Sequence, residues 1–169
     1  MEWTGARYSD TPTVEVLTWI DAPPDRVWPL VSDVGLMPGM SSELQSVEWL
    51  DGATGPAVGA RFAGRSRHEA MGEWESTSQV VECEPGRLFA WAVGDPGDPA
   101  AVWRFRLEPY GAGTELSEWV QLGPGQSGLS LAIERMPDKE QKIVFVRMRE
   151  FERNITATLA HIKKLAEEA

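Results

Sequence analysis

The 169-residue chain has little cysteine, histidine and tyrosine: it contains one cysteine, Cys83, two histidines and two tyrosines. A single cysteine cannot form an internal disulfide framework, which favours a reducing compartment. Cys83 and the widely spaced histidines do not match the ligand spacing of a zinc site. The sequence also has no Gly-x-Ser-x-Gly motif and no phosphate-binding glycine loop. We therefore expect no metal and no cofactor.

Long apolar runs and basic clusters are also missing. No stretch approaches the roughly 20 apolar residues of a membrane span, and no N-terminal run resembles a signal peptide. The formal net charge is −10 without a lysine or arginine cluster, which argues against nucleic acid and anionic membranes as partners. Hydrophobic residues make up 42% of the chain, which is enough for one folded domain. We expect a cytoplasmic protein without stable membrane insertion, as a monomer or a homodimer.

Tryptophan is in excess, with eight residues beside five phenylalanines. Two explanations are open: a tryptophan-rich core, or a cavity lined by aromatic side chains. Composition alone favours the core, because buried aromatic residues usually serve packing.

The longest regular pattern predicts a C-terminal helix over residues 138–168. Seven apolar residues recur three or four positions apart and so share one helical face: Val144, Met148, Phe151, Ile155, Leu159, Ile162 and Leu165. Charged residues fill the other faces, and Pro137 suits the first helical position. Such a helix needs an apolar surface to pack on.

Alternating patterns upstream predict that surface as a sheet. The first strand covers residues 13–20, and Pro24 then opens a helix that Pro29 keeps short. Six further strands are predicted at residues 43–50, 60–68, 71–83, 88–93, 101–108 and 114–122. Short turn-forming separators indicate an antiparallel meander. The segment 123–137 is predicted to be a mobile flap over one end.

Strand parity predicts which side chains face the helix. In residues 60–68, three arginines alternate with Phe62, Ser66 and His68, so the arginines face water. In the last strand the parity is ambiguous, and we choose the face that carries Leu116 and Glu118. The inward faces give these candidate ligand contacts: Phe62, Ser66, His68, Trp74, Ser76, Ser78, Phe89, Trp91, Trp103, Phe105, Leu116, Met136, Val144, Met148 and Phe151.

A sheet with one apolar face and a helix with one apolar stripe can cover each other. We therefore predict an α+β fold: a curved seven-stranded antiparallel sheet wrapped around the long C-terminal helix, with two short helices after the first strand. Residues 1–12 are predicted to form a flexible N-terminal arm, and residues 13–169 a single domain.

Four motifs make the sequence similar to a known superfamily: residues 20–28 (IDAPPDRVW), 58–62 (VGARF), 83–88 (CEPGRL) and 113–116 (GTEL). They resemble the START-related helix-grip (SRPBCC) superfamily, and most closely its polyketide cyclase/dehydrase branch. The resemblance implies a helix-grip fold with a cavity between sheet and long helix that takes apolar or aromatic small molecules. It supplies no shared catalytic motif, because the superfamily hosts carriers, receptors and cyclases alike.

His68 and Glu118 are the candidate catalytic residues. An imidazole titrates near neutral pH and can act as a general acid or base. A buried Glu118 would have a raised pKa and could pair with His68 or hold a substrate hydroxyl. The alternatives are that His68 only binds water at a strand end and that Glu118 faces outward.

Three functions remain open. The preferred hypothesis is binding or carriage of a hydrophobic or aromatic small molecule, which needs no catalytic set. The second is a polyketide cyclase or dehydratase that uses His68 and Glu118, and it requires both side chains to reach one cavity. The third is a protein-interaction module whose interior is filled.

Overall fold

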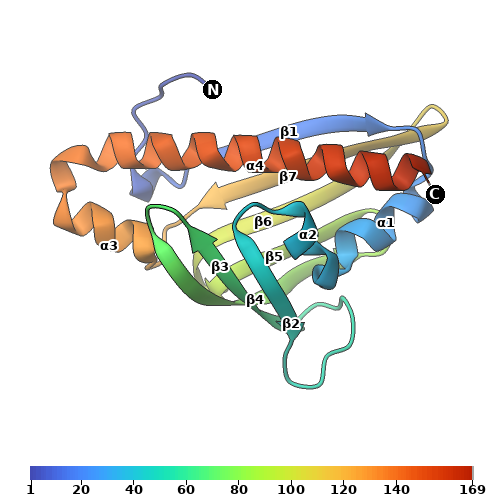
Figure 1. The fold of residues 1–169 in the computed structure, drawn as a ribbon, viewed down its shortest axis with the longest axis horizontal. Coiled ribbons are helices and arrows are strands. Elements are labelled where there is room, and N and C mark those ends of the chain that lie inside the picture. Colours follow the sequence, from blue (N-terminus) through green and yellow to red (C-terminus); the bar gives the residue numbers. More distant parts are fainter. Residues whose placement is uncertain (169) are drawn as a thin grey trace.

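The computed structural model describes residues 1–168 (Figure 1). The strands are β1 Thr13–Ile20, β2 Leu44–Trp49, β3 Arg61–His68, β4 Gly72–Glu84, β5 Leu88–Asp95, β6 Asp98–Tyr110 and β7 Gly113–Leu122. The helices are α1 Pro24–Ser32, α2 Met37–Met40, α3 Gly128–Arg135 and α4 Glu140–Glu168, with short 3-10 turns η1 Tyr8–Asp10, η2 Val34–Leu36 and η3 Pro137–Lys139.

The seven strands form one antiparallel sheet in the order β1-β7-β6-β5-β4-β3-β2. Strands β2 to β7 pair with their sequence neighbours, and β1 adds to β7 with Thr13 opposite Gln121. The sheet curves around α4, which runs along β1 and β7 (Figure 1). The predicted α+β helix-grip architecture is therefore confirmed.

One hairpin differs from its prediction. The sequence pattern leaves residues 94–100 as a separator, whereas β5 continues to Asp95 and β6 starts at Asp98, so only Pro96 and Gly97 form the turn. The carboxylate of Asp95 accepts a hydrogen bond from the Gly97 N–H at 2.8 Å and holds the turn. A register shift after Val93 accommodates the change. Turn-forming residues thus bend this hairpin without ending its ladder.

The apolar face of α4 packs on the sheet. Six of the predicted positions are buried: Val144, Met148, Phe151, Ile155, Leu159 and Ile162. In the last turns Ala166 is buried in place of the predicted Leu165, which is half-buried, because the core-facing stripe continues four residues after Ile162. None of the helices within residues 1–168 combines the length and the apolar content that a bilayer crossing requires.

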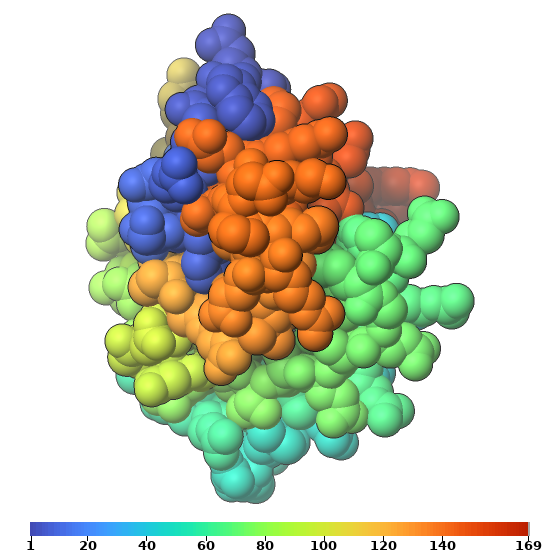
Figure 2. Space-filling view, turned by 90° about the vertical axis from the view of Figure 1, so that its left-hand side faces the viewer, coloured from blue at the N-terminus to red at the C-terminus, as the bar shows by residue number. Residues whose placement is uncertain are grey.

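The N-terminal segment lies against α3 and the start of α4, which close one end of the molecule (Figure 2). Tyr8 is buried, and its hydroxyl donates to the carbonyl oxygen of Gly125 at 2.6 Å. Arg7 forms an ion pair with Glu140 of α4 at 3.2 Å. These contacts anchor the segment near residue 8. Three expectations stay predictions: that residues 1–12 are flexible, that residues 13–169 form a single domain, and that residues 123–137 are mobile.

Candidate ligand-binding site

The sheet and α4 leave a hollow of about 350 Å³ between them, which we call the central hollow. Its sheet side, the floor, includes small inward-facing residues of β3 and β4: Gly64, Ser66, Ser76 and Ser78. Small residues at these positions leave volume that larger side chains would occupy in a close-packed interior. The size of the hollow lies within the range of small-molecule sites.

Aromatic side chains form a continuous row across the central hollow. Trp91 of β5 lies opposite Trp103 of β6, and their rings stack with centroids 6.3 Å apart. Phe62 contacts Trp91 edge to face at 6.2 Å, and Phe151 of α4 contacts Trp103 at 5.1 Å. These rings pack on one another and also border the hollow. The same tryptophans therefore serve as core packing and as the border of a cavity, the two explanations offered for the tryptophan excess.

Most of the predicted contact residues reach the central hollow. Those that border it are Phe62, Ser66, Trp74, Ser76, Ser78, Trp91, Trp103, Phe105 and Phe151. Glu118, the second candidate catalytic residue, borders it too. Ligand contact by these residues stays a prediction, but the structure brings them to one place.

The remaining predicted residues do not border the central hollow: His68, Phe89, Leu116, Met136, Val144 and Met148. Phe89 instead packs its ring on Trp28 of α1 with centroids 6.3 Å apart. Met136 lies after the end of α3 and is 41% exposed. Parity and helical spacing predict the face on which a side chain lies, but they do not predict its position along that face.

Sequence reasoning missed the hydrogen-bonded group Glu43, Arg147 and Asn154 at the central hollow. It also missed the hydroxyl residues Ser41, Ser127 and Thr158. Arg147, Phe151 and Asn154 follow helical spacing on α4 and so share a face. A signal for Arg147 and Asn154 was therefore available, namely polar residues at the edge of the apolar stripe. Glu43 carried no such signal. The predicted strand 43–50 includes it, whereas β2 begins at Leu44 and leaves Glu43 outside the alternation of the strand.

Glu118 is an unpartnered carboxyl on the floor of the central hollow. It lies on β7 opposite Phe105 of β6 and is 6% exposed. Its Oε2 atom has no hydrogen-bond partner among residues 1–168. Burial disfavours the ionised form and raises the pKa of Glu118 from 4.5 to about 8. The side chain is therefore mostly protonated at pH 7, and the predicted rise of its pKa is confirmed.

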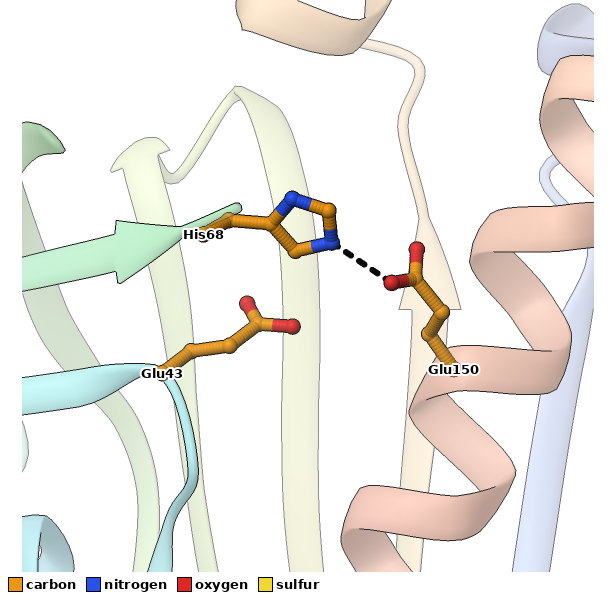
Figure 3. A group of neighbouring side chains, drawn as sticks. All are labelled: Glu43, His68 and Glu150. Atoms are coloured by element: carbon orange, nitrogen blue, oxygen red, sulfur yellow. Dashed lines mark hydrogen bonds and ion pairs between the residues drawn. The ribbon is translucent and has the colours of Figure 1, made fainter. Parts of the chain in front are cut away.

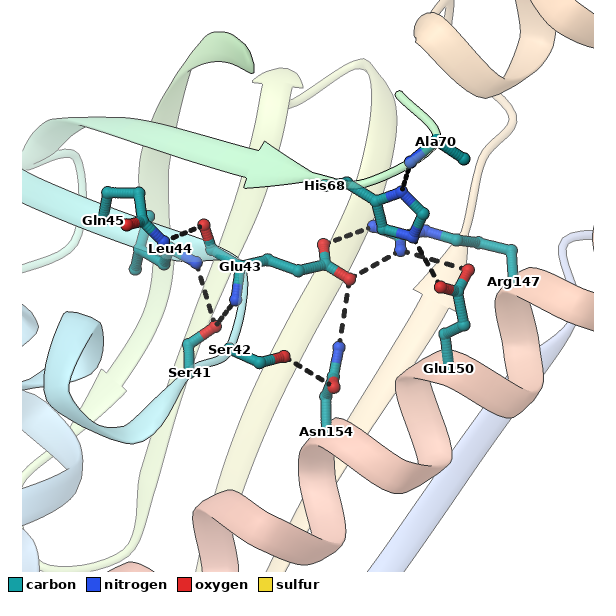
Figure 4. A network of polar contacts seen from close by, with 10 residues as sticks. All are labelled: Ser41, Ser42, Glu43, Leu44, Gln45, His68, Ala70, Arg147, Glu150 and Asn154. Atoms are coloured by element: carbon teal, nitrogen blue, oxygen red, sulfur yellow. Dashed lines mark hydrogen bonds and ion pairs between the residues drawn. The ribbon is translucent and has the colours of Figure 1, made fainter. Parts of the chain in front are cut away.

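Glu43 is a second carboxyl of the same hollow, and it is fully partnered (Figure 4). Arg147 donates two hydrogen bonds to its carboxylate, each 2.8 Å long, and the amide of Asn154 donates a third at 3.2 Å. Burial opposes ionisation of Glu43, but the hydrogen bonds and the positive charge of Arg147 outweigh it and hold its pKa below the usual value. The guanidinium of Arg147 also lies over the ring of Phe151 at 4.6 Å.

His68 belongs to this polar network and does not meet Glu118. Its Nδ1 accepts a hydrogen bond from the Ala70 N–H at 3.0 Å, so the proton of the neutral ring is on Nε2. Nε2 donates to Glu150 of α4 at 2.5 Å (Figure 3). His68 borders a separate, outer hollow with Glu43 and Glu150. The predicted His68–Glu118 pair is thus replaced by a His68–Glu150 pair, because His68 lies at the strand end, beside α4.

We call Glu43, His68, Arg147, Glu150 and Asn154 the rim network, since it joins the ends of β2 and β3 to α4 (Figure 4). Oxygen and nitrogen atoms of Glu43, His68 and Glu150 lie within 4.8 Å of one another, a spacing that could hold a metal ion. Arg147, however, occupies both carboxylate oxygens of Glu43 and lies 3.5 Å from Glu150. A cation would have to displace this guanidinium, so the arrangement fits an ion-pair network better than a metal centre.

A sheet that grips one long helix around a partly open interior defines the helix-grip class of proteins. The family model described as polyketide cyclase/dehydrase and lipid transport matches residues 11–167. The chain therefore belongs to this family, as the four motifs suggested.

Solved structures agree with the family. A polyketide-cyclase-like protein of Corynebacterium glutamicum is 32% identical, with 92% of this chain and 91% of that chain covered and a TM-score of 0.67. The di-domain ARO/CYC StfQ from the steffimycin biosynthetic pathway is 14% identical, with 92% of this chain and 50% of that chain covered and a TM-score of 0.70. The second likeness supports the fold alone. No functionally curated protein is similar enough in sequence to count as a match.

Proposed function

We propose that the protein binds or carries an uncharged aromatic small molecule in the central hollow. The observation that carries this proposal is the hollow itself, about 350 Å³ bordered by Trp74, Trp91, Trp103 and Phe151. Ring faces at these positions offer stacking surfaces to a planar ligand. Membership of a cyclase and lipid-transport family supports a hydrophobic ligand.

The charge distribution of the central hollow supports an uncharged ligand. Glu43 and Arg147 are bonded to each other, so neither has a free charge to offer. Glu118 is the remaining ionisable residue among those that border the hollow within residues 1–168, and burial favours its neutral form. A mainly apolar interior with a few polar groups is the usual plan of a site for a small organic molecule.

Filling the hollow tests this proposal. Ser76→Phe places a ring in the space that Ser76 borders, whereas Thr77→Phe places the same ring on the outer face of β4. Titration with 2-ethylnaphthalene, followed by tryptophan fluorescence and calorimetry, is expected to show binding to the native protein and to Thr77→Phe. We expect at least tenfold weaker binding to Ser76→Phe. Equal binding to the two variants would place the probe outside the central hollow.

A second candidate is a cyclase or dehydratase, and the raised pKa of Glu118 favours it over a general interaction module. A carboxyl with a pKa of about 8 can give or accept a proton near neutral pH. In this version Glu118 acts without His68, which pairs with Glu150 at the rim. Turnover that is lost in Glu118→Gln would identify an enzyme, and binding without turnover would identify a carrier.

A cytoplasmic location and a monomeric or homodimeric state stay predictions.

A further inference from the structure

We propose that the ligand presents a carbonyl oxygen to Glu118, which makes the central hollow a site for neutral aromatic ketones or related carbonyl compounds. This inference rests on the binding function proposed above and names the chemical class of the ligand. It concerns Glu118 alone, a side chain that the fold itself does not explain.

The structural argument begins with an unsatisfied atom. Oε2 of Glu118 is buried and lacks a hydrogen-bond partner among the described residues, 1–168. Leaving a buried polar group unpaired costs roughly 1–3 kcal/mol, and an apolar residue of similar size would avoid that cost. Glu118 borders the central hollow, so a rotation of its carboxyl group would let a molecule within the hollow supply the missing partner.

The surroundings of Glu118 decide what kind of partner fits. Phe105 lies opposite it on β6, and Val16 of β1 lies opposite it on the other side. The charged groups that border the hollow from other elements are Glu43, before β2, and Arg147 of α4, and they are bonded to each other. Glu118 therefore has no neighbouring charge to stabilise its ionised form, and burial keeps it protonated at pH 7. A protonated carboxyl donates its O–H, and the matching ligand group is an acceptor such as a carbonyl oxygen.

A ligand with a positive charge is a poorer match. It would require Glu118 to ionise within an apolar wall, and both charges would lose their hydration. A ligand carboxylate is also a poor match, because Glu43 already occupies Arg147 with two hydrogen bonds.

The test uses three naphthalenes with the same ring and different substituents. 2-Acetylnaphthalene carries a carbonyl, 2-ethylnaphthalene replaces it by a methylene, and 2-naphthylmethylammonium carries a positive charge. Dissociation constants are measured at pH 6.5 for the native protein, Glu118→Gln and Glu118→Leu. The ratio of ketone to hydrocarbon affinity is compared between proteins, because this comparison cancels the different hydration of the two probes. Circular dichroism confirms that each variant is folded.

We expect the ketone-to-hydrocarbon ratio to fall about tenfold in Glu118→Leu, which has no donor, because one buried hydrogen bond is lost. In Glu118→Gln the amide still donates, and the ratio should stay within about threefold of the native value. A ratio that is the same in all three proteins would overturn the inference while leaving aromatic binding intact. An ammonium probe whose binding depends on Glu118, with an unchanged ketone ratio, would also overturn it. If none of the probes binds the native protein, the proposed function falls and this inference falls with it.

Discussion

Glu118 and Glu43 are two carboxyl groups of one hollow, and their surroundings shift their pKa values in opposite directions. Glu118 is buried, and Glu43 is half-buried. Glu118 on the floor has an unpartnered Oε2 and lies among apolar side chains, whereas Glu43 at the rim accepts hydrogen bonds from Arg147 and Asn154. The difference shows that hydrogen bonds and a counter-charge outweigh desolvation at the half-buried Glu43, whereas nothing offsets desolvation at the buried Glu118.

The same comparison separates two roles. The rim network satisfies its own charges and joins the ends of β2 and β3 to α4, so its function is accounted for within the fold. The floor carboxyl is unsatisfied within residues 1–168, which is why we propose it as a ligand contact. Three changes test this division, in order of decreasing effect on stability at pH 6.

Removing the rim guanidinium should have the largest effect. Arg147→Met leaves the half-buried Glu43 without its counter-charge, and we expect the free energy of unfolding at pH 6 to fall by about 3 kcal/mol. Urea denaturation measures the change. The matched control is Glu43→Gln combined with Arg147→Met, which removes both charges and should recover more than half of the loss. A single variant as stable as the native protein would show that the rim pair does not hold the fold.

Glu118→Gln tests the floor, and here the effect depends on pH. The pKa of Glu118 is raised in the folded state, so its contribution to stability is present below about pH 4.5 and is lost as the pH rises to about 8. The variant should nearly equal the native protein at pH 4.5 and exceed its unfolding free energy by roughly 2 kcal/mol at pH 6 and roughly 5 kcal/mol at pH 9. Denaturation curves at these pH values measure the difference. A pH-independent difference would mean that Glu118 is ionised or hydrated in the folded protein.

His68→Ala should have the smallest effect. His68 and Glu150 are partly exposed, with side-chain exposures of 16% and 22%, and Glu150 retains Arg147 at 3.5 Å. We expect less than about 1 kcal/mol of destabilisation and unchanged affinity for 2-ethylnaphthalene. His161→Ala, at an exposed position of α4, is the matched control. If His68→Ala instead abolished probe binding, the separation between rim and floor would be wrong.

Several elements could be predicted from the sequence because they follow from local periodicity. The stripe from Val144 to Ile162 predicted the buried face of α4, and alternation predicted that Phe62, Ser78 and Phe105 face inward. The hairpin at Asp95–Asp98 was not predicted. Its residues favour turns locally, but pairing between β5 and β6 extends the strands through them. The pairing of His68 with Glu150 was not predicted either, because these residues are 82 positions apart.

By itself, the sequence determined most of the residues that face the interior, since a side chain's face depends on a period of two or of 3.6 residues that can be counted along the chain. Only the tertiary structure decided which of those residues surround empty space and which carboxyl has a partner. Both depend on distances between segments remote in sequence: Glu43 meets Arg147 across 104 positions, while nothing within residues 1–168 reaches Oε2 of Glu118. That unequal supply of partners sets the two pKa values apart, because a buried carboxyl ionises only where another group supplies the hydrogen bonds and charge that water no longer provides.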